Sequence, residues 1–338
     1  MLVLDTRVYG DEGYILAERK DELMFIPEEI LTCVVFLGFR LTDKSYRMAG
    51  SAFWVVRPMA PDIRENFAYL VTAKHVIQHI KDKGLLQVYV RVNLRDGGTR
   101  WIKTELGDWI LQDSTDVAAI QLGFTNELEH TGWPITGCAD EVLVKSKRVG
   151  IGHEVFIAGM FSRRIGNTKN IPIVRVGNIA SIPSRTELVQ TKLGPMAAYL
   201  IEARSIAGIS GSPVFIDING ALPALRNRGP SYCLIGLMHG HYDVKEPNDD
   251  STVDDGLQKT SVNMGIAIII PSEEVIAVIK RFSAKDDQAI ANHRRRTAPT
   301  MDVADVAETQ TTKDGIYIPV PTKDSFIGDL KKASRKKG

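Results

Sequence analysis

The sequence predicts an all-β globular unit that ends in a single helix. Between about residues 30 and 283, short apolar or alternating runs recur, bounded by Gly, Pro, Asn and Asp as strands are bounded by turns. Val and Ile are enriched in these runs because branched side chains suit a pleated sheet. Only one stretch shows a clear helical period. Strands at this density favour a sandwich or a barrel.

Each run is short enough to form one strand. In chain order, we expect strands over Thr32–Phe39, Ser51–Arg57, Ala68–Thr72, Leu86–Val92, Val117–Leu122, Glu154–Ala158, Ile171–Ile179, Tyr199–Ala203, Ser212–Ile218, Cys233–Met238 and Asn263–Ile270.

The helical period follows Pro271, and we expect a helix over about residues 272–283. Apolar side chains from Val275 to Phe282 form one stripe. Ser272 is the expected N-cap, and two glutamates follow it in the first turn, where the helix dipole favours anions. This helix closes the globular unit.

Composition divides the chain into three parts. They are an N-terminal extension over residues 1–29, the globular unit over 30–283 with a junction between its halves near 125–150, and a tail over 284–338. The tail is rich in Ala, Asp, Thr and Gln and has few large apolar residues. It cannot bury enough apolar surface to offset the entropy of ordering, so we expect it to be flexible.

The tail carries two apolar islands, Gly315–Pro321 and Asp324–Leu330. Islands of this kind suit docking on a protein partner, for example by adding a strand to a sheet edge. Two alternatives stay open, namely a tail that packs on its own domain and a plain linker. The run Arg294–Arg296 has no interleaved aromatic residues, so we expect no nucleic-acid partner.

Overall charge and cysteine usage point to a cytoplasmic protein. The 338 residues carry a formal net charge of +1, which favours neither nucleic acid nor an anionic membrane surface. No apolar run approaches the roughly 20 residues of a membrane span, and the N-terminus lacks the pattern of a secretory signal. The cysteines Cys33, Cys138 and Cys233 are odd in number and far apart, which indicates free thiols in a reducing compartment.

Three local motifs carry residue types that perform nucleophilic catalysis. Tyr69–Val76 is a strand that runs into Thr-Ala and then His75. Ser114–Leu122 places Asp116 immediately before a buried strand. In Ala207–Phe215, Ser210 lies between Gly208 and Gly211, and a proline and a predicted strand follow.

The chemistry explains these residue types. A serine hydroxyl is a poor nucleophile at neutral pH and needs a base, for which His75 is the candidate because imidazole titrates near neutrality. Asp116 would bind the other ring N–H and fix the tautomer. The main-chain N–H groups of Gly208 and Ser210 would form the oxyanion hole, because a glycine-rich turn can direct both at one point. We expect no cofactor and no metal.

Taken in order, the motifs resemble those of trypsin-like (chymotrypsin-fold) serine peptidases, closest in style to the bacterial HtrA/Deg type. That family shows T-A-x-H-V, then D-[hydrophobic]-A-x-[hydrophobic], then G-x-S-G-[GS]-P. Gly50–Val55 resembles a further family strand, and Leu234–Leu237 and Gly265–Pro271 resemble the strands that wall the specificity pocket. The resemblance covers about residues 30–283. It implies two six-stranded antiparallel β-barrels with the catalytic groups at their junction, and a serine endopeptidase that forms an acyl-enzyme on Ser210.

Several residues depart from the family pattern. Ile209 stands where zymogen-derived members have an aspartate, so activation by a freed N-terminus is not expected and the oxyanion loop must be ordered by packing or by a partner. From the length and polarity of residues 284–338, we expect no PDZ module in the tail. Ala52, Ile209 and Ser212 keep open an alternative, a peptidase-fold binding module or adaptor with little or no catalysis.

The resemblance also suggests a substrate pocket for a protein or peptide. Arg204, six residues before the nucleophile, would lie at its base and favour an acidic side chain, unless it pairs with Glu202 or points to solvent. The wall would include Leu237, Met238, His239 and Gly240.

Other interpretations of single residues remain. The Gly208–Pro213 segment could be a plain turn, His75 a satisfied core histidine and Asp116 a strand cap, while Asp113 is a rival for the acid role. Cys233, His239 and His241 suggest a metal, but the sequence offers no further well-spaced ligand pair for one.

Overall fold

A computed structural model describes residues 26–42, 45–123, 125–146, 149–161, 164–203, 209–218, 232–244 and 262–297, together with the backbone of 8–9, 15–16, 309–311 and 317–319. The chain divides into two compact units, Met1–Asp287 and Gln288–Gly338. The first unit holds all the candidate site residues.

The N-terminal half of the first unit is a sheet of eight strands. Its path of hydrogen-bonded neighbours is β7-β6-β3-β4-β5-β9-β8, and β10 pairs in parallel with β4. The strands are β3 (Val34–Thr42), β4 (Ser45–Ala60), β5 (Ile63–Thr72), β6 (Gln87–Asn93), β7 (Thr99–Glu105), β8 (Ile110–Leu111), β9 (Ala118–Gln121) and β10 (Trp133–Pro134).

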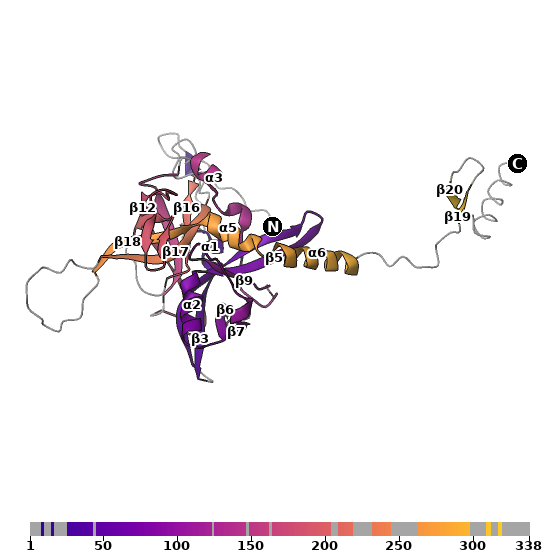
Figure 1. The fold of residues 1–338 in the computed structure, drawn as a ribbon, viewed down its shortest axis with the longest axis horizontal. Helices are drawn as coiled ribbons and strands as arrows, with labels where there is room; N and C mark the ends of the chain where they lie inside the picture. Colours follow the sequence, from indigo (N-terminus) through magenta and orange to yellow (C-terminus); the bar gives the residue numbers. More distant parts are fainter. Residues whose placement is uncertain are drawn as a thin grey trace, which may run out of the picture. The chain divides into compact units, whose positions relative to one another are not determined.

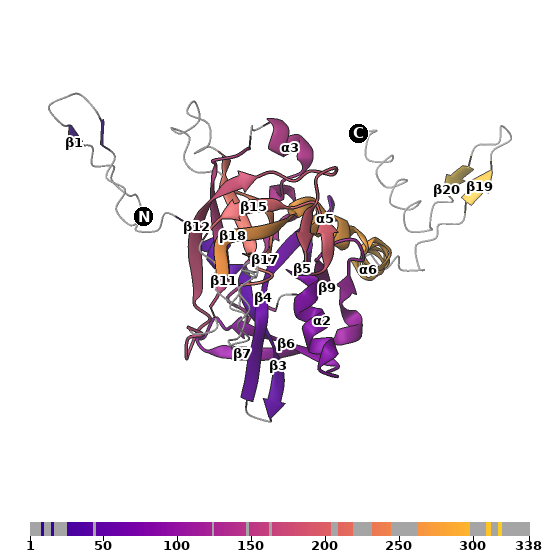
Figure 2. The same ribbon diagram turned by 60° about the vertical axis from the view of Figure 1, so that its left-hand side comes forward.

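The C-terminal half is a closed barrel of six strands with the order β11-β12-β15-β18-β17-β16. In Figure 1 and Figure 2 the barrel lies above the sheet. Its strands are β11 (Glu154–Met160), β12 (Pro172–Ser181), β15 (Tyr199–Glu202), β16 (Pro213–Asp217), β17 (Tyr232–Val244) and β18 (Val262–Pro271), and a small hairpin of β13 (Val189–Thr191) and β14 (Gly194–Met196) precedes β15.

The predicted all-β class and one six-stranded barrel are therefore confirmed, whereas a second closed barrel is not formed by the described strands. The outer strands of the sheet, β7 and β8, pair with β6 and β9 and not with each other. A short 3-10 turn, η1 (Leu106–Asp108), joins them, and the Trp109 indole N–H donates to Thr104 Oγ1 across this turn. With only two residues in β8, the ladder with β9 uses all of that strand.

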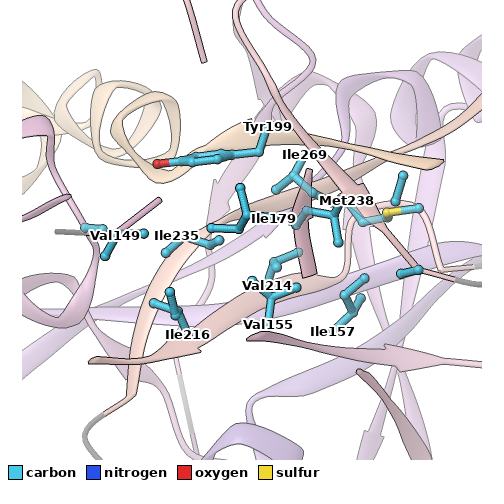
Figure 3. Close-up of a cluster of buried hydrophobic side chains, with 14 of the residues drawn as sticks. Val149, Val155, Ile157, Ile179, Tyr199, Val214, Ile216, Ile235, Met238 and Ile269 are labelled. Carbon is cyan, nitrogen blue, oxygen red and sulfur yellow. The ribbon is translucent and has the colours of Figure 1, made fainter. Parts of the chain in front are cut away.

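Alternating side chains fill the barrel, as strand geometry requires. Val155 and Ile157 from β11 face Val214 and Ile216 from β16, and all four are at most 1% exposed (Figure 3). Burying each such side chain stabilises the fold by roughly 2 kcal/mol. The packed barrel thus supports the turn before β16, which carries Ser210, and strand β17, which carries His239.

The two halves meet along β4 and the linker that follows β9. Ser51 Oγ accepts the main-chain N–H of Met160 at 3.0 Å, which joins β4 to β11. Ala139, in the linker, donates its N–H to Leu234 O at 2.8 Å. The Trp133 ring packs edge-on against Phe215, with centroids 4.7 Å apart. The linker includes the 3-10 turn η2 (Ile135–Gly137) and helix α3 (Glu141–Ser146) and lies in the predicted 125–150 region.

Helix α5 (Ser272–Lys280) confirms the predicted helix, but Ser272 is not its N-cap. The cap position is Pro271, and the buried Ser272 is the first helical residue. Its hydroxyl donates to the main-chain oxygen of Ala139, so this serine anchors the helix to the linker. Two further described helices of the first unit are α1 (Glu28–Thr32) and α2 (Lys74–Asp82).

A further helix, α6 (Ser283–Thr297), corrects the prediction of a flexible segment directly after residue 283. Asp286 in its first turn is fully buried and accepts hydrogen bonds from Tyr69 Oη at 2.5 Å and Gln121 Nε2 at 2.7 Å, and it also pairs with Arg57. The composition of the tail did not indicate an ordered helix, because the partners of Asp286 lie on β4, β5 and β9, more than 160 residues away in the chain.

Replacing Asp286 by alanine is expected to lower the free energy of unfolding by about 3 kcal/mol, because it leaves three polar groups without their shared buried acceptor. The neighbouring Asp287 is exposed, so Asp287→Ala is the matched control and should change stability by less than about 0.5 kcal/mol. Urea denaturation of both variants measures the difference. Equal, small losses would show that the Asp286 cluster contributes nothing to stability.

The described residues at the two ends of the chain form two short antiparallel strand pairs. In the N-terminal extension β1 (Val8–Tyr9) pairs with β2 (Ile15–Leu16), and in the second unit β19 (Thr309–Thr311) pairs with β20 (Tyr317–Pro319). The second apolar island, Asp324–Leu330, lies outside the described residues. Among the described helices, none is long and apolar enough to cross a membrane. The three cysteines are free and buried, as expected.

Candidate active site

The first candidate residue, His75, lies in the first turn of α2. Strand β5 ends at Thr72, Ala73 is extended, and the helix begins at Lys74. The Lys74 N–H donates to Asp116 O at 3.2 Å, and its ammonium donates to the main-chain oxygen of Gln112 at 2.7 Å. These contacts fasten the start of α2 to the loop before β9, which explains why two motifs far apart in sequence meet.

Asp116 is fully buried and holds His75 with both carboxylate oxygens. Its Oδ1 accepts the main-chain N–H of His75 at 2.8 Å, and its Oδ2 lies 2.7 Å from His75 Nδ1. A third contact comes from the barrel, because His239 Nδ1 lies 2.5 Å from the same Oδ2. Asp113, the rival for the acid role, has an exposed side chain.

The pKa of Asp116 is lowered to about 2. Burial is the largest influence and acts to raise the pKa, but the hydrogen bonds from His239 and His75 and their positive charges together outweigh it. Asp116 is therefore ionised at neutral pH. A carboxylate accepts hydrogen bonds only, so each histidine directs a protonated Nδ1 at it. His75 is then left with Nε2 as a free acceptor when neutral.

Ser210 lies in a turn that packs closely against the end of β5. Ser210 O accepts the N–H of Ser51 at 2.9 Å, and Gly211 donates its N–H to Met238 O at 2.8 Å. Gly211 has φ +84°, and a Cβ there would lie 2.2 Å from Ser51 O and 2.3 Å from Thr72 Oγ1. Only glycine fits this position. The turn therefore approaches the strand that leads to His75.

Close packing holds the nucleophile turn from the other side as well. A Cβ on Gly50 would lie 3.0 Å from Ser210 O, so the glycine of the β4 motif is needed for this approach. Ile209, which departs from the family pattern, is 2% exposed and belongs to the barrel core. The residue before the serine is thus anchored by apolar packing.

The hydroxyl of Ser210 does not bond to His75 in this structure. Its Oγ donates to the main-chain oxygen of His239 at 3.2 Å, and no hydrogen bond joins it to the His75 ring among the described residues. His75 thus contacts Asp116 directly, and the Ser210 turn lies beside them where the sheet meets the barrel. The Ser210 hydroxyl points to His239 on β17. Gly208 and Arg204 lie outside the described residues, so their predicted roles stay predictions.

Three residues of the predicted pocket wall are held in the barrel or at the candidate site. Leu237 and Met238 are fully buried, and Met238 lies in the barrel core (Figure 3). The main chain of Met238 bonds to both Gly211 and Ser212, so it holds the nucleophile turn. His239 contacts Asp116, a role that the sequence analysis missed. Its only local signal was a polar side chain at an alternate position of a buried strand.

His75, Asp116 and His239 offer three ligand-type atoms within 4.8 Å of one another. The two nitrogens lie only 2.5 and 2.7 Å from one carboxylate oxygen, which are hydrogen-bond distances. Ligands about 2.0–2.1 Å from a tetrahedral zinc lie more than about 3.2 Å apart. The arrangement fits a hydrogen-bonded cluster better than a metal centre. Of the three residues that suggested a metal in the sequence, neither Cys233 nor His241 belongs to this group.

A cavity of about 810 Å³ lies among α3, α5 and the β13–β14 hairpin. Its lining includes Thr115, beside Asp116, and Thr115 Oγ1 donates to Glu274 at 3.2 Å. None of His75, Asp116 and Ser210 lines it. It is therefore separate from the candidate site.

Two comparisons by sequence find no relative, since no family model and no curated protein matches the chain. Solved structures do show a likeness. The crystal structure of Deg5 is 16% identical with a TM-score of 0.44, over 75% of this chain and 90% of that one. Inactive forms of Rv3671c from M. tuberculosis are similar too, one a serine-to-alanine mutant (16% identical, TM-score 0.37) and one described as a protease (17%, 0.36), each over 75% of this chain and 89% of the other. These likenesses concern the fold alone, so the roles of residues depend on the geometry described above.

The lowered pKa of Asp116 predicts acid sensitivity. The pKa of Asp116 is about 2 in the folded state and 3.8 in its ordinary state. Between pH 2 and pH 3.8, the folded state therefore binds fewer protons than the unfolded state. The resulting stabilisation, roughly 2 kcal/mol, is complete above about pH 4 and is lost as the pH falls toward 2. Urea titrations at pH 5, 4 and 3 should show a steeper loss of stability for the wild type than for Asp116→Asn. Parallel curves would contradict the assignment.

Proposed function

We propose that the chain is a serine endopeptidase in which Ser210 is the nucleophile, His75 the general base and Asp116 the residue that orients the base. The main support is the contact between His75 and a buried, ionised Asp116 beside a glycine-dependent turn that carries a serine. A buried carboxylate on Nδ1 of an imidazole, with Nε2 free, is the arrangement that a general base for serine requires.

The proposed reaction begins with rotation of the Ser210 side chain. Its hydroxyl leaves His239 O and turns to Nε2 of His75, which takes the proton as Oγ bonds to the substrate carbonyl carbon. Asp116 stabilises the imidazolium that forms. Collapse of the tetrahedral intermediate breaks the peptide C–N bond, the leaving amine takes the proton from His75, and an acyl-enzyme remains on Ser210. Water then repeats the sequence and releases the acid.

Two further roles complete the proposal. The main-chain N–H groups of Gly208 and Ser210 form the oxyanion hole, and each such donor typically contributes about 3–4 kcal/mol to the transition state. Arg204 at the pocket base favours an acidic substrate side chain. We propose that the oxyanion loop, residues 205–211, is ordered either by packing, as at Ile209, or by a partner that binds the tail.

The free thiols support the cytoplasmic location that we propose. Cys33, Cys138 and Cys233 are all buried and free, and burial raises the pKa of Cys138 to about 12. Such thiols are inert and suit a reducing compartment, so the proposal places the peptidase in the cytoplasm.

A binding module without catalysis is the second candidate function. The resting hydrogen bond from Ser210 Oγ to His239 O favours it, because the nucleophile is not joined to its base. A module of this kind would retain peptide binding and show no covalent chemistry at Ser210.

Labelling with a fluorophosphonate probe separates the two candidates. The serine peptidase should form a covalent adduct on Ser210, His75→Ala should abolish the labelling, and Ser212→Ala should retain it because that hydroxyl is fully buried. If the folded wild type binds peptides but no serine is labelled, with or without a partner bound to the tail, the binding module is the correct function.

A further inference from the structure

His239 is the only residue of the barrel that donates to Asp116 among the described residues. It lies on β17, its side chain is 10% exposed, and its ring meets the ring of His75 edge-on with centroids 5.4 Å apart. Both imidazoles direct Nδ1 at Oδ2 of Asp116, at 2.7 Å for His75 and 2.5 Å for His239. One carboxylate oxygen therefore serves two histidines from opposite halves of the unit.

The carboxylate needs this second histidine for a physical reason. Asp116 has no exposure to water, so each of its lone pairs must find a protein donor or remain unsatisfied. Of its three donors among the described residues, two belong to His75 in the first turn of α2. Without a donor from the barrel, the carboxylate could rotate with His75 as a pair. The third contact fixes the pair relative to β17.

The same residue also holds the nucleophile. The main-chain oxygen of His239 accepts the Ser210 hydroxyl at 3.2 Å, while its neighbour Met238 bonds to Gly211 and Ser212. His239 thus contacts Asp116 through its ring and Ser210 through its backbone. A substitution at this position changes the first contact and leaves the second in place.

We propose that His239 is a positioning residue that holds Asp116, and through it His75, in register with the Ser210 turn. This rests on the proposed peptidase function. The ring donates one Nδ1–H to Asp116, and no bond to substrate is required of it. Because it shares Oδ2 with His75, it also limits how strongly the carboxylate attracts the proton of His75.

Two substitutions separate the hydrogen bond from packing. His239→Asn keeps an N–H donor near the position of Nδ1, whereas His239→Leu keeps volume and removes the donor. We expect His239→Leu to lower kcat by about 10- to 100-fold with KM within about threefold, and to move the acid limb of kcat/KM upward by about half a pH unit. His239→Asn should lie within about threefold of the wild type. The exposed His79 on α2 provides the control, because His79→Asn should change neither quantity.

Other charged groups near the cluster stay the same in all variants. Lys74 is turned to the main chain of Gln112 and Asp113, and Glu274 is bonded to Thr115. A shift of the acid limb in His239→Leu alone therefore reports the lost donor. Equal losses in the Leu and Asn variants, with no shift, would show that His239 only packs and would overturn the proposal.

A readout that needs no activity distinguishes this proposal from the peptidase function. Proton NMR of the full chain should show two downfield Nδ1–H signals, one from His75 and one from His239. His239→Leu should remove one signal and displace the other, while circular dichroism confirms folding. If these signals behave as expected and no substrate is cleaved, the positioning contact holds and the peptidase function fails. A folded, active enzyme in which His239→Leu leaves the His75 signal unmoved would refute the positioning role.

Discussion

Replacing Ser210 by alanine is expected to lower kcat by at least about 10³-fold and to leave the fold intact. The side chain is half-buried in a turn held by main-chain bonds to Ser51, and its only described hydrogen bond is to His239 O. Removing the hydroxyl thus removes the nucleophile without disturbing the turn. Turnover of a casein or peptide-library substrate, measured with thermal unfolding on the same preparation, checks both parts.

Ser212 supplies the matched control for this experiment. It lies two residues away in the same turn and is fully buried, and its hydroxyl has no hydrogen-bond partner among the residues that the structure describes. Ser212→Ala should keep kcat within about threefold and leave the protein as stable or about 1 kcal/mol more stable, because an unsatisfied buried hydroxyl is removed. The assignment of the nucleophile is wrong if Ser210→Ala retains a tenth of the activity or if Ser212→Ala loses it.

Asp116→Asn is the second change with a large expected effect, a fall in kcat of about 10⁴-fold, as for the same change in other Ser-His-Asp enzymes. An amide at this position directs an N–H at the ring and favours the tautomer of His75 that has its proton on Nε2. That tautomer cannot accept the proton of Ser210. The structure adds a second reason, because the amide also loses the charge that His239 shares. Steady-state kinetics with a peptide substrate measures the loss.

The exposed Asp113, three residues earlier, is the control for the acid role. Asp113→Asn should change kcat by no more than about twofold, since only its main-chain oxygen contacts Lys74. If Asp113→Asn were the more damaging variant, the orienting carboxylate would have been misassigned.

The contact between His75 and Asp116 was predicted from motifs whose order and spacing resemble those of a known family, and no single motif was sufficient. Each lies at the end or start of a strand whose alternation is visible in the sequence, and the adjacent strands β5 and β9 bring the two together. The barrel strands were predictable for the same reason. The rotamer of Ser210 was not, because one rotation about a single bond decides whether the hydroxyl meets His75 or His239 O.

Two features missed from the sequence depend on partners distant in the chain. His239 finds Asp116 across 123 residues, and Asp286 finds Tyr69 across 217. Amino-acid composition does not distinguish a polar residue that is buried by such a contact from one that is exposed to solvent. The segment that forms α6 was therefore expected to be flexible. The open sheet was also missed, because no hydrophobic period in the sequence shows that β8 has two residues and does not pair with β7.

The most direct test of the account compares His75→Ala, Ser210→Ala and the double variant in single-turnover hydrolysis of one peptide substrate. If the two residues act as one unit, the double variant should hydrolyse the peptide within about threefold of either single variant. Rate losses that multiply in the double variant would show that His75 and Ser210 act independently, and would contradict the proposed triad.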